Sequence, residues 1–116
     1  MNNDEGFEKI KRFVIEQRWD YSFLLERTTK IEKDLKITGD DAVEFIFAFS
    51  KQFNVDVSNF MMTEYFEPEG DKILPAIIRF FTGQKKAKNK ELLLGDVERA
   101  VEAGKLDNTV IESAKV

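Results

Sequence analysis

Two absent side chains limit the chemistry open to this chain. Its 116 residues contain no histidine and no cysteine, which excludes thiol nucleophiles, imidazole or thiolate metal sites and histidine acid–base catalysis. Among the carboxylates that remain, Asp40 lies beside Asp41, and Glu67 lies two residues before Glu69. Neither pair has the ligand spacing of a calcium loop or the apolar shielding of a tuned catalytic acid. We therefore expect no enzyme activity, no metal site and no cofactor.

A hydroxyl stands at a predicted helix start, in the stretch DLKITGDDAVEF (residues 34–45). Thr38 precedes a helix predicted from Asp40 to Phe53, and Asp41, three residues on, approximates a capping box. This pattern favours Thr38 as the N-cap residue over Thr38 as a modified side chain. Gly39 has no hydroxyl to modify, and we interpret it as a backbone residue at the turn from loop to helix.

The long predicted helix has one continuous apolar stripe, which indicates a core-facing side. The stripe falls at three- and four-residue steps and consists of Ala42, Phe45, Ile46, Phe49 and Phe53. Four residues of the adjoining flank combine acids with apolar side chains: Asp40, Val43, Glu44 and Phe47. One interpretation makes these four a partner-binding patch. The other is that a further helix predicted at 75–83 covers the two apolar side chains, which would make them ordinary core.

Most of the remaining chain has a helical period or a helix end signal. Beyond the helix at 75–83, helices are predicted from about Asp4 to Arg18 and from 95 to 103, and Asn54 is expected to end the long helix. The tail from Asn108 is expected to fray. Residues 1–116 are predicted to form a single all-α domain.

The segment from residue 19 to residue 36 has no clear period. Its apolar residues are clustered near its start and are followed by polar ones. We interpret it as a long ordered loop whose apolar residues are held against the core, with Trp19 and Tyr21 as anchors.

The segment TKIEKDLKITGDDAVEFIFAFSKQFNVDV (29–57) resembles the central part of an acyl carrier protein. The features that match in order are Ile31, Asp34, Leu35, the helix 40–53 with Phe53 at its end, Val55 and Val57. Three further motifs, FNVDVSNF, YFEPEG and LLLGDVERAVEAGKL, resemble more closely an acyl-carrier-like family of small bacterial proteins of unknown function. The resemblance extends from about Phe7 to Leu106.

This resemblance implies an acyl-carrier-like four-helix bundle with an inserted segment, residues 66–90, that carries an extra helix. In acyl carriers a serine at the start of the second helix takes phosphopantetheine. The corresponding position here is Gly39, so the resemblance implies a protein without the prosthetic group. Its second helix would still present a surface to partner proteins.

Charge and hydropathy narrow the range of partners. The net charge is −4 and the sequence pI is about 5.0, which disfavours nucleic acid because phosphate binding needs a basic surface. The longest apolar clusters, AIIRFF and EFIFAF, are far shorter than a membrane span. The first residues include early acids and no apolar run, unlike a signal peptide. We expect a cytoplasmic protein with no membrane partner.

The sequence thus predicts a non-catalytic, acyl-carrier-like protein that binds an unidentified protein partner through helix 40–53. Two alternatives stay open. One is an atypical carrier modified on Thr38. The other is a binder of a small apolar ligand, because the chain has 11 phenylalanines, which can either line a cavity or fill it.

Overall fold

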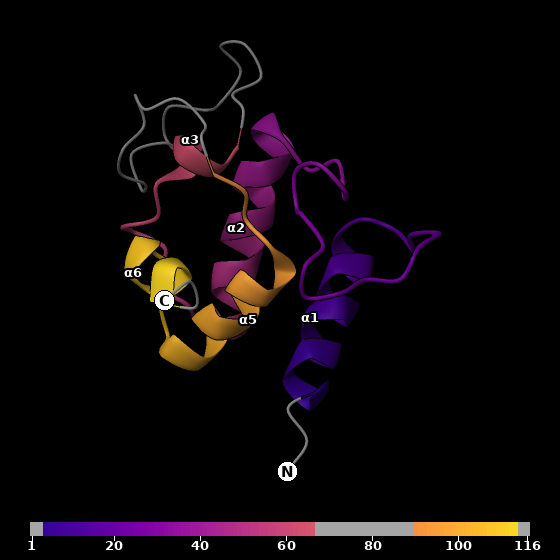
Figure 1. The fold of residues 1–116 in the computed structure, drawn as a ribbon, viewed down its shortest axis with the longest axis horizontal. Coiled ribbons are helices and arrows are strands. Elements are labelled where there is room, and N and C mark those ends of the chain that lie inside the picture. The colour runs from indigo at the N-terminus through magenta and orange to yellow at the C-terminus, as the bar shows by residue number, and fades with distance from the viewer. Residues whose placement is uncertain (1–3, 67–89, 114–116) are drawn as a thin grey trace.

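The computed structural model describes residues 4–66 and 90–113. These residues form helices, which in chain order are α1 (Asp4–Gln17), α2 (Gly39–Phe53), α3 (Met62–Tyr65), α5 (Leu94–Ala103) and α6 (Asn108–Glu112) (Figure 1). Within the same residues, β structure is limited to two isolated bridges, Lys30–Leu93 and Asp56–Lys105. The predicted all-α class is therefore confirmed. The helix predicted at 75–83 lies outside the described residues.

Helices α1 and α2 pack on each other through phenylalanine rings. Phe13 of α1 is buried, and its ring centroid lies 5.3 Å from that of Phe45 and 5.6 Å from that of Phe53. Phe49 completes the cluster at 6.2 Å from Phe13. Such offset and edge-on ring pairs stabilise a core beyond the area that they bury. The apolar stripe predicted on the long helix is thus its core face.

The backbone ends α2 where the sequence indicates. Asn54 follows the helix in the left-handed conformation, with φ of 56°, and its N–H bonds to the carbonyl oxygen of Ser50. Asparagine tolerates this conformation better than most residues, which makes it a common helix end. The Ser50 hydroxyl also donates to the carbonyl oxygen of Val55, at 2.6 Å.

The loop between α1 and α2 has one half that is fixed in the core. Its residues 27–31 run beside residues 92–95, joined by hydrogen bonds from Ile31 N–H to Leu92 C=O (2.9 Å) and from Gly95 N–H to Arg27 C=O (2.9 Å). The side chains that this pairing helps to bury are Ile31, Leu35 and Ile37, each with 0% of its surface exposed. The prediction of an ordered, core-bound loop is correct for this half.

The C-terminal part returns to the core rather than fraying. Helix α6 begins after Asp107, whose carboxylate accepts from the Val110 N–H at 3.0 Å. Val110 and Ile111 are buried, and α6 packs on α5, which in turn packs on α1. The expectation of a frayed tail is therefore wrong for residues 108–112, because two apolar side chains were enough to hold a short capped helix.

Candidate functional site

Helix α2 does not offer the apolar surface that its sequence suggested. Val43 is 2% exposed and belongs to the core, and Phe47 is partly buried and packed against it. Asp40 is partly buried and Glu44 is exposed. The four predicted patch residues thus present mainly carboxylates to solvent. Of the two interpretations, the partner-binding patch needs an exposed Val43, and for this residue it is corrected, because the helix buries more than its predicted stripe.

Gly39 has the backbone role expected of it. It is buried and has φ of 57°, in the left-handed region that side chains rarely adopt. Thr38 occupies the N-cap position of α2, but its side chain makes no capping hydrogen bond. Its hydroxyl instead donates to the carboxylate of Glu32. The Thr38 side chain therefore links the loop to the helix start rather than closing the first helical turn.

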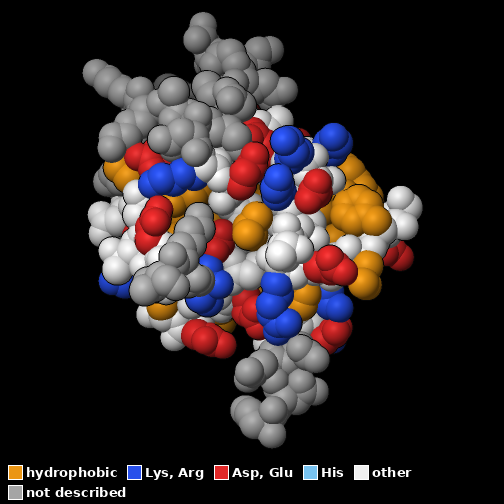
Figure 2. Space-filling model, viewed as in Figure 1, with side chains coloured by type: hydrophobic (Ala, Val, Ile, Leu, Met, Phe, Trp, Pro, Cys, Tyr) orange, Lys and Arg blue, Asp and Glu red, His pale blue; other side chains and the backbone are white. Residues whose placement is uncertain are grey.

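Among the described residues, the large apolar side chains that are exposed lie elsewhere, around the end of α1 and the start of the following loop. Leu24 is 71% exposed, Trp19 51%, Phe23 44% and Ile15 39%. With the half-buried Tyr21 they make up what we term the aromatic face. Figure 2 shows hydrophobic side chains gathered at the right-hand edge, where Figure 1 places this loop. Contiguous exposed apolar surface of this kind marks interaction sites.

The aromatic face is an ordered array of rings. The Trp19 and Tyr21 centroids are 5.3 Å apart, and those of Tyr21 and Phe23 are 5.4 Å apart. The Arg18 guanidinium stacks on Trp19, 4.5 Å from the ring centroid. The Tyr21 hydroxyl donates to the Leu35 carbonyl oxygen at 2.7 Å, which anchors the array to the core-bound half of the loop. The rings are thus held in position while their surfaces stay in water.

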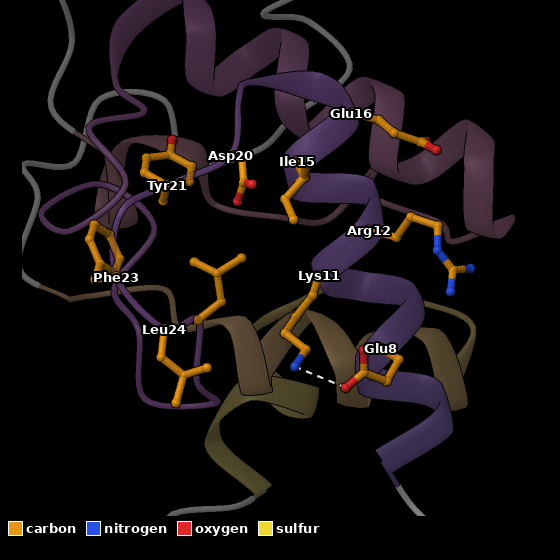
Figure 3. A pocket seen from close by; sticks show the side chains of 10 residues that line it. Glu8, Lys11, Arg12, Ile15, Glu16, Asp20, Tyr21, Phe23 and Leu24 are labelled. Carbon is orange, nitrogen blue, oxygen red and sulfur yellow. Dashed lines mark ion pairs between the residues drawn. The ribbon is translucent and has the colours of Figure 1, made fainter.

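A groove of about 380 Å³ separates this loop from α1. In Figure 3, Tyr21, Phe23 and Leu24 line it from the loop and Ile15 from the helix. Asp20 stands at one end. At the other end are Lys11 and Glu8, whose side chains form an ion pair of 2.9 Å. Arg12 and Glu16 also belong to its rim but point away from the loop.

The sequence contained a signal for this face, but the clustering of apolar residues at the start of the loop obscured it. Trp19, Tyr21 and Phe23 are spaced by two, so in an extended segment their side chains fall on the same side. Ile15 lies off the stripe of α1 that includes Phe13. The interpretation of Trp19 as a core anchor is wrong. Tyr21 is an anchor, because its hydroxyl donates to the Leu35 carbonyl oxygen.

Away from the aromatic face, a polar cluster joins α3, α6 and residue 90. Lys90 Nζ lies 3.0 Å from Glu64 and 3.5 Å from Glu112, and the Tyr65 hydroxyl donates to Asn108 at 2.8 Å. The hydrogen bond to Glu64 raises the pKa of Lys90 above its usual value. Burial, reinforced by Glu112, raises the pKa of Tyr65. Both groups keep their ordinary charge near neutral pH, so the cluster is suited to holding elements together rather than to proton transfer.

Two further tests of the described part of the chain bear on function. Residues 4–66 and 90–113 contain no group of three or more acids placed to hold a metal ion. In the same two ranges, none of the helices has the length and apolar character that crossing a bilayer requires.

Comparison with family models places the chain in a family. A family model described as "Protein of unknown function (DUF1493)" matches residues 8–106. The chain belongs to the DUF1493 family. This match overturns the resemblance to acyl carrier proteins, because the family that accounts for most of the chain is a DUF1493 domain and not an acyl-carrier family. The aromatic face and its groove are formed by residues inside the DUF1493 match. No curated protein and no solved structure matches the chain.

Proposed function

We propose that this protein is a non-catalytic interaction module that binds a protein partner through the aromatic face. The observation that carries the proposal is the exposure of Trp19, Phe23 and Leu24. A net charge of −4 favours a protein over nucleic acid as the partner, and the composition is consistent with action in the cytoplasm. Surface acids of α2 such as Glu44 would lie outside the main contact.

The energetics of the aromatic face support this proposal. Covering a large apolar side chain contributes about 1.5–3 kcal/mol relative to leaving it in water. Tryptophan, tyrosine and arginine are the residues over-represented where binding energy concentrates. Here all three types stand together, because Arg18 is stacked on Trp19 beside Tyr21. The fixed ring array also lowers the ordering entropy that binding would cost.

The position of Arg18 adds rigidity to the same face. Its guanidinium contacts the Asp41 carboxylate of α2 at 3.3 Å while stacking on Trp19. The side chain is therefore held from two sides, by an ion pair and by a ring. A partner that covers Trp19 would meet a prearranged surface rather than one that must be ordered on binding.

A small apolar ligand is a second candidate occupant, favoured by the size of the groove. Its volume of about 380 Å³ falls within the range of small-molecule sites, about 300–1,000 Å³. A ligand of this kind would raise the melting temperature of the purified protein by mass action. Thermal unfolding with and without decanoate tests it, and an unchanged melting temperature at millimolar ligand would reject it.

Site-specific photo-cross-linking tests the main proposal. A benzophenone amino acid replaces Leu24, and in a matched control it replaces Glu102, an exposed residue of α5. We expect a discrete protein–protein adduct from position 24 in the expressing cells and none from position 102. The adduct should disappear when Trp19→Ala is added. Equal labelling from the two positions, or no adduct from position 24, would reject the aromatic face as a binding surface.

A further inference from the structure

We infer that the partner fitted to the aromatic face is a second copy of this chain, docked about a two-fold axis that passes through the groove. This inference rests on the proposed function and names its occupant. Three properties of the face support it: its shape, its exposed apolar area and the arrangement of the charges around it.

The shape of the face combines a projecting side chain with two hollows directly beside it. Leu24, the most exposed apolar side chain in the described residues, lines the groove of about 380 Å³ against α1. With Phe23 it also lines a second hollow of about 350 Å³ on the side of Thr28 and Lys33. A surface that carries a projection and an adjacent hollow can insert each into the other when two copies meet about a two-fold axis.

The area of the face matches what a symmetric dimer requires. The exposed fractions of Ile15, Trp19, Phe23 and Leu24 correspond to roughly 300–500 Å² of apolar surface, taking about 150–250 Å² for each whole side chain. A standard interface buries about 800 Å² per partner, of which roughly 57% is apolar. The four side chains therefore supply most of the apolar share of one such interface.

The two ends of the groove carry different charged groups, an unbalanced acid at one and an ion pair at the other. Asp20 stands at one end and Lys11 at the other, where it is paired with Glu8 (Figure 3). Asp20 forms no ion pair with any other residue of 4–66 and 90–113. A two-fold axis that crosses the middle of the groove, perpendicular to its length, would bring the Lys11 end of one copy to the Asp20 end of the other, twice in each dimer. In that arrangement Lys11, already paired with Glu8, would also face the Asp20 carboxylate of the other copy, so that each copy supplies the charge that the other needs.

A charge exchange between these ends tests the geometry. Sedimentation velocity of the full chain over a range of concentrations gives the dimer dissociation constant. We compare Lys11→Glu and Asp20→Lys, each alone and as an equimolar mixture. Matched controls are Lys51→Glu and Glu102→Lys, which make the same charge changes at exposed positions on α2 and α5. Circular dichroism and thermal unfolding establish that every variant is folded.

The expected result is a concentration-dependent dimer in the unaltered protein. Each groove variant alone should dimerise at least ~10-fold more weakly, because two like-charge contacts then face each other in every dimer. The mixture should recover dimerisation as a heterodimer, in which both contacts again join opposite charges. The two control variants should dimerise like the unaltered protein.

Two results would overturn the inference. One is a monomer at all concentrations up to about 1 mM, the weak limit of specific association. The other is a dimer that both groove variants weaken and that their mixture fails to restore. A monomer that still gives an adduct with a different protein from position 24 would reject the second copy and leave the interaction function standing. The loss of both the dimer and the adduct would reject the proposed function as well.

Discussion

A methyl group added at Gly95 would lie 3.1 Å from the carbonyl oxygen of Arg27 and 3.3 Å from its Cβ. Both neighbours are held in place, because the Gly95 N–H donates to the same carbonyl oxygen at 2.9 Å. At the scale of single residues, this close contact fixes the loop to the start of α5. The Arg27 guanidinium adds an ion pair of 2.7 Å to Glu98 one turn further along.

We predict that Gly95→Ala lowers the free energy of unfolding by about 1–3 kcal/mol, the usual range for overpacking a tight contact. The control is Gly6→Ala in α1, where the nearest atom to an added Cβ is 4.0 Å away. Glycine to alanine at a roomy helical site stabilises by up to about 1 kcal/mol. Urea unfolding measures both variants. Equal effects of the same sign would contradict the close contact.

Tyr65 provides a prediction on pH. Burial raises its pKa above the ordinary value of 10.0, so the folded state favours the neutral phenol more than the unfolded state does. This contribution to stability is fully present below pH 10 and is lost as the pH rises further. Lys90, whose pKa is also raised, acts in the same direction.

We therefore expect Tyr65→Phe to be less stable than the unaltered protein at pH 8, by about 1 kcal/mol, because the hydrogen bond to Asn108 is lost. The difference in the free energy of unfolding between the two proteins should narrow above pH 10, since the phenylalanine variant has no proton to lose at that position. Urea unfolding at pH 8 to 11 measures this difference. Tyr21→Phe, at the other tyrosine of the chain, is the control. A gap that stays constant over this range would show that Tyr65 does not titrate as described.

At the scale of elements, the loop between α1 and α2 combines two different halves. Residues 27–37 are fixed by backbone pairing with residues 92–95 and by buried aliphatic side chains. Residues 18–24 project the aromatic face into solvent. The Tyr21 hydroxyl joins the two halves through the Leu35 carbonyl oxygen. The exposed rings therefore depend on the buried half for their arrangement.

This dependence predicts separable effects of Tyr21→Phe. The variant keeps the ring and removes the hydrogen bond, so stability should fall by about 0.5–1.5 kcal/mol. The dimer should also weaken, although no apolar contact surface is removed, because the rings must then be ordered on binding. Urea unfolding and sedimentation velocity measure the two effects. A variant that is less stable but dimerises normally would show that the hydroxyl supports the fold alone.

The three longer helices, α1, α2 and α5, could be predicted from the sequence, because each has a local signal. The apolar period of α2 and Asn54 at its end give its core face and its boundary. The loop could not, because its structure depends on pairing with residues more than sixty positions away. Composition alone does not distinguish a ring that is buried by such distant segments from one that they leave exposed. Trp19 and Leu25 belong to the same apolar-rich stretch of the chain, yet one is 51% and the other 7% exposed.

The interpretation of α2 residues as an apolar patch did not foresee the burial of Val43, for a related physical reason. A helical period identifies the face that is most apolar, but it does not count how many elements cover the helix. Val43 lies outside the stripe and is buried nonetheless. Glu44, the next residue in the chain, is exposed. Burial around a helix is therefore decided by its neighbours in space, which the local sequence does not specify.

At the scale of the whole molecule, the described elements leave one side for binding. Figure 1 places α3 and α6 to the left and α1 with its following loop to the right. The polar cluster of Glu64, Lys90 and Glu112 ties together elements on the left. The aromatic face lies on the right, where a partner can cover it without disturbing that cluster. This division is consistent with a folded module that uses one side for structure and another for recognition.

Tryptophan fluorescence gives the most direct test of this account, because Trp19 is the one tryptophan of the chain. The account predicts red-shifted emission and efficient acrylamide quenching in dilute protein, where the ring is half exposed. At concentrations that favour the dimer, emission should shift to shorter wavelength and quenching should fall. Leu24→Asp should keep the dilute spectrum at every concentration. Emission that is shielded in the dilute monomer, or that does not change while the protein dimerises, would contradict the account.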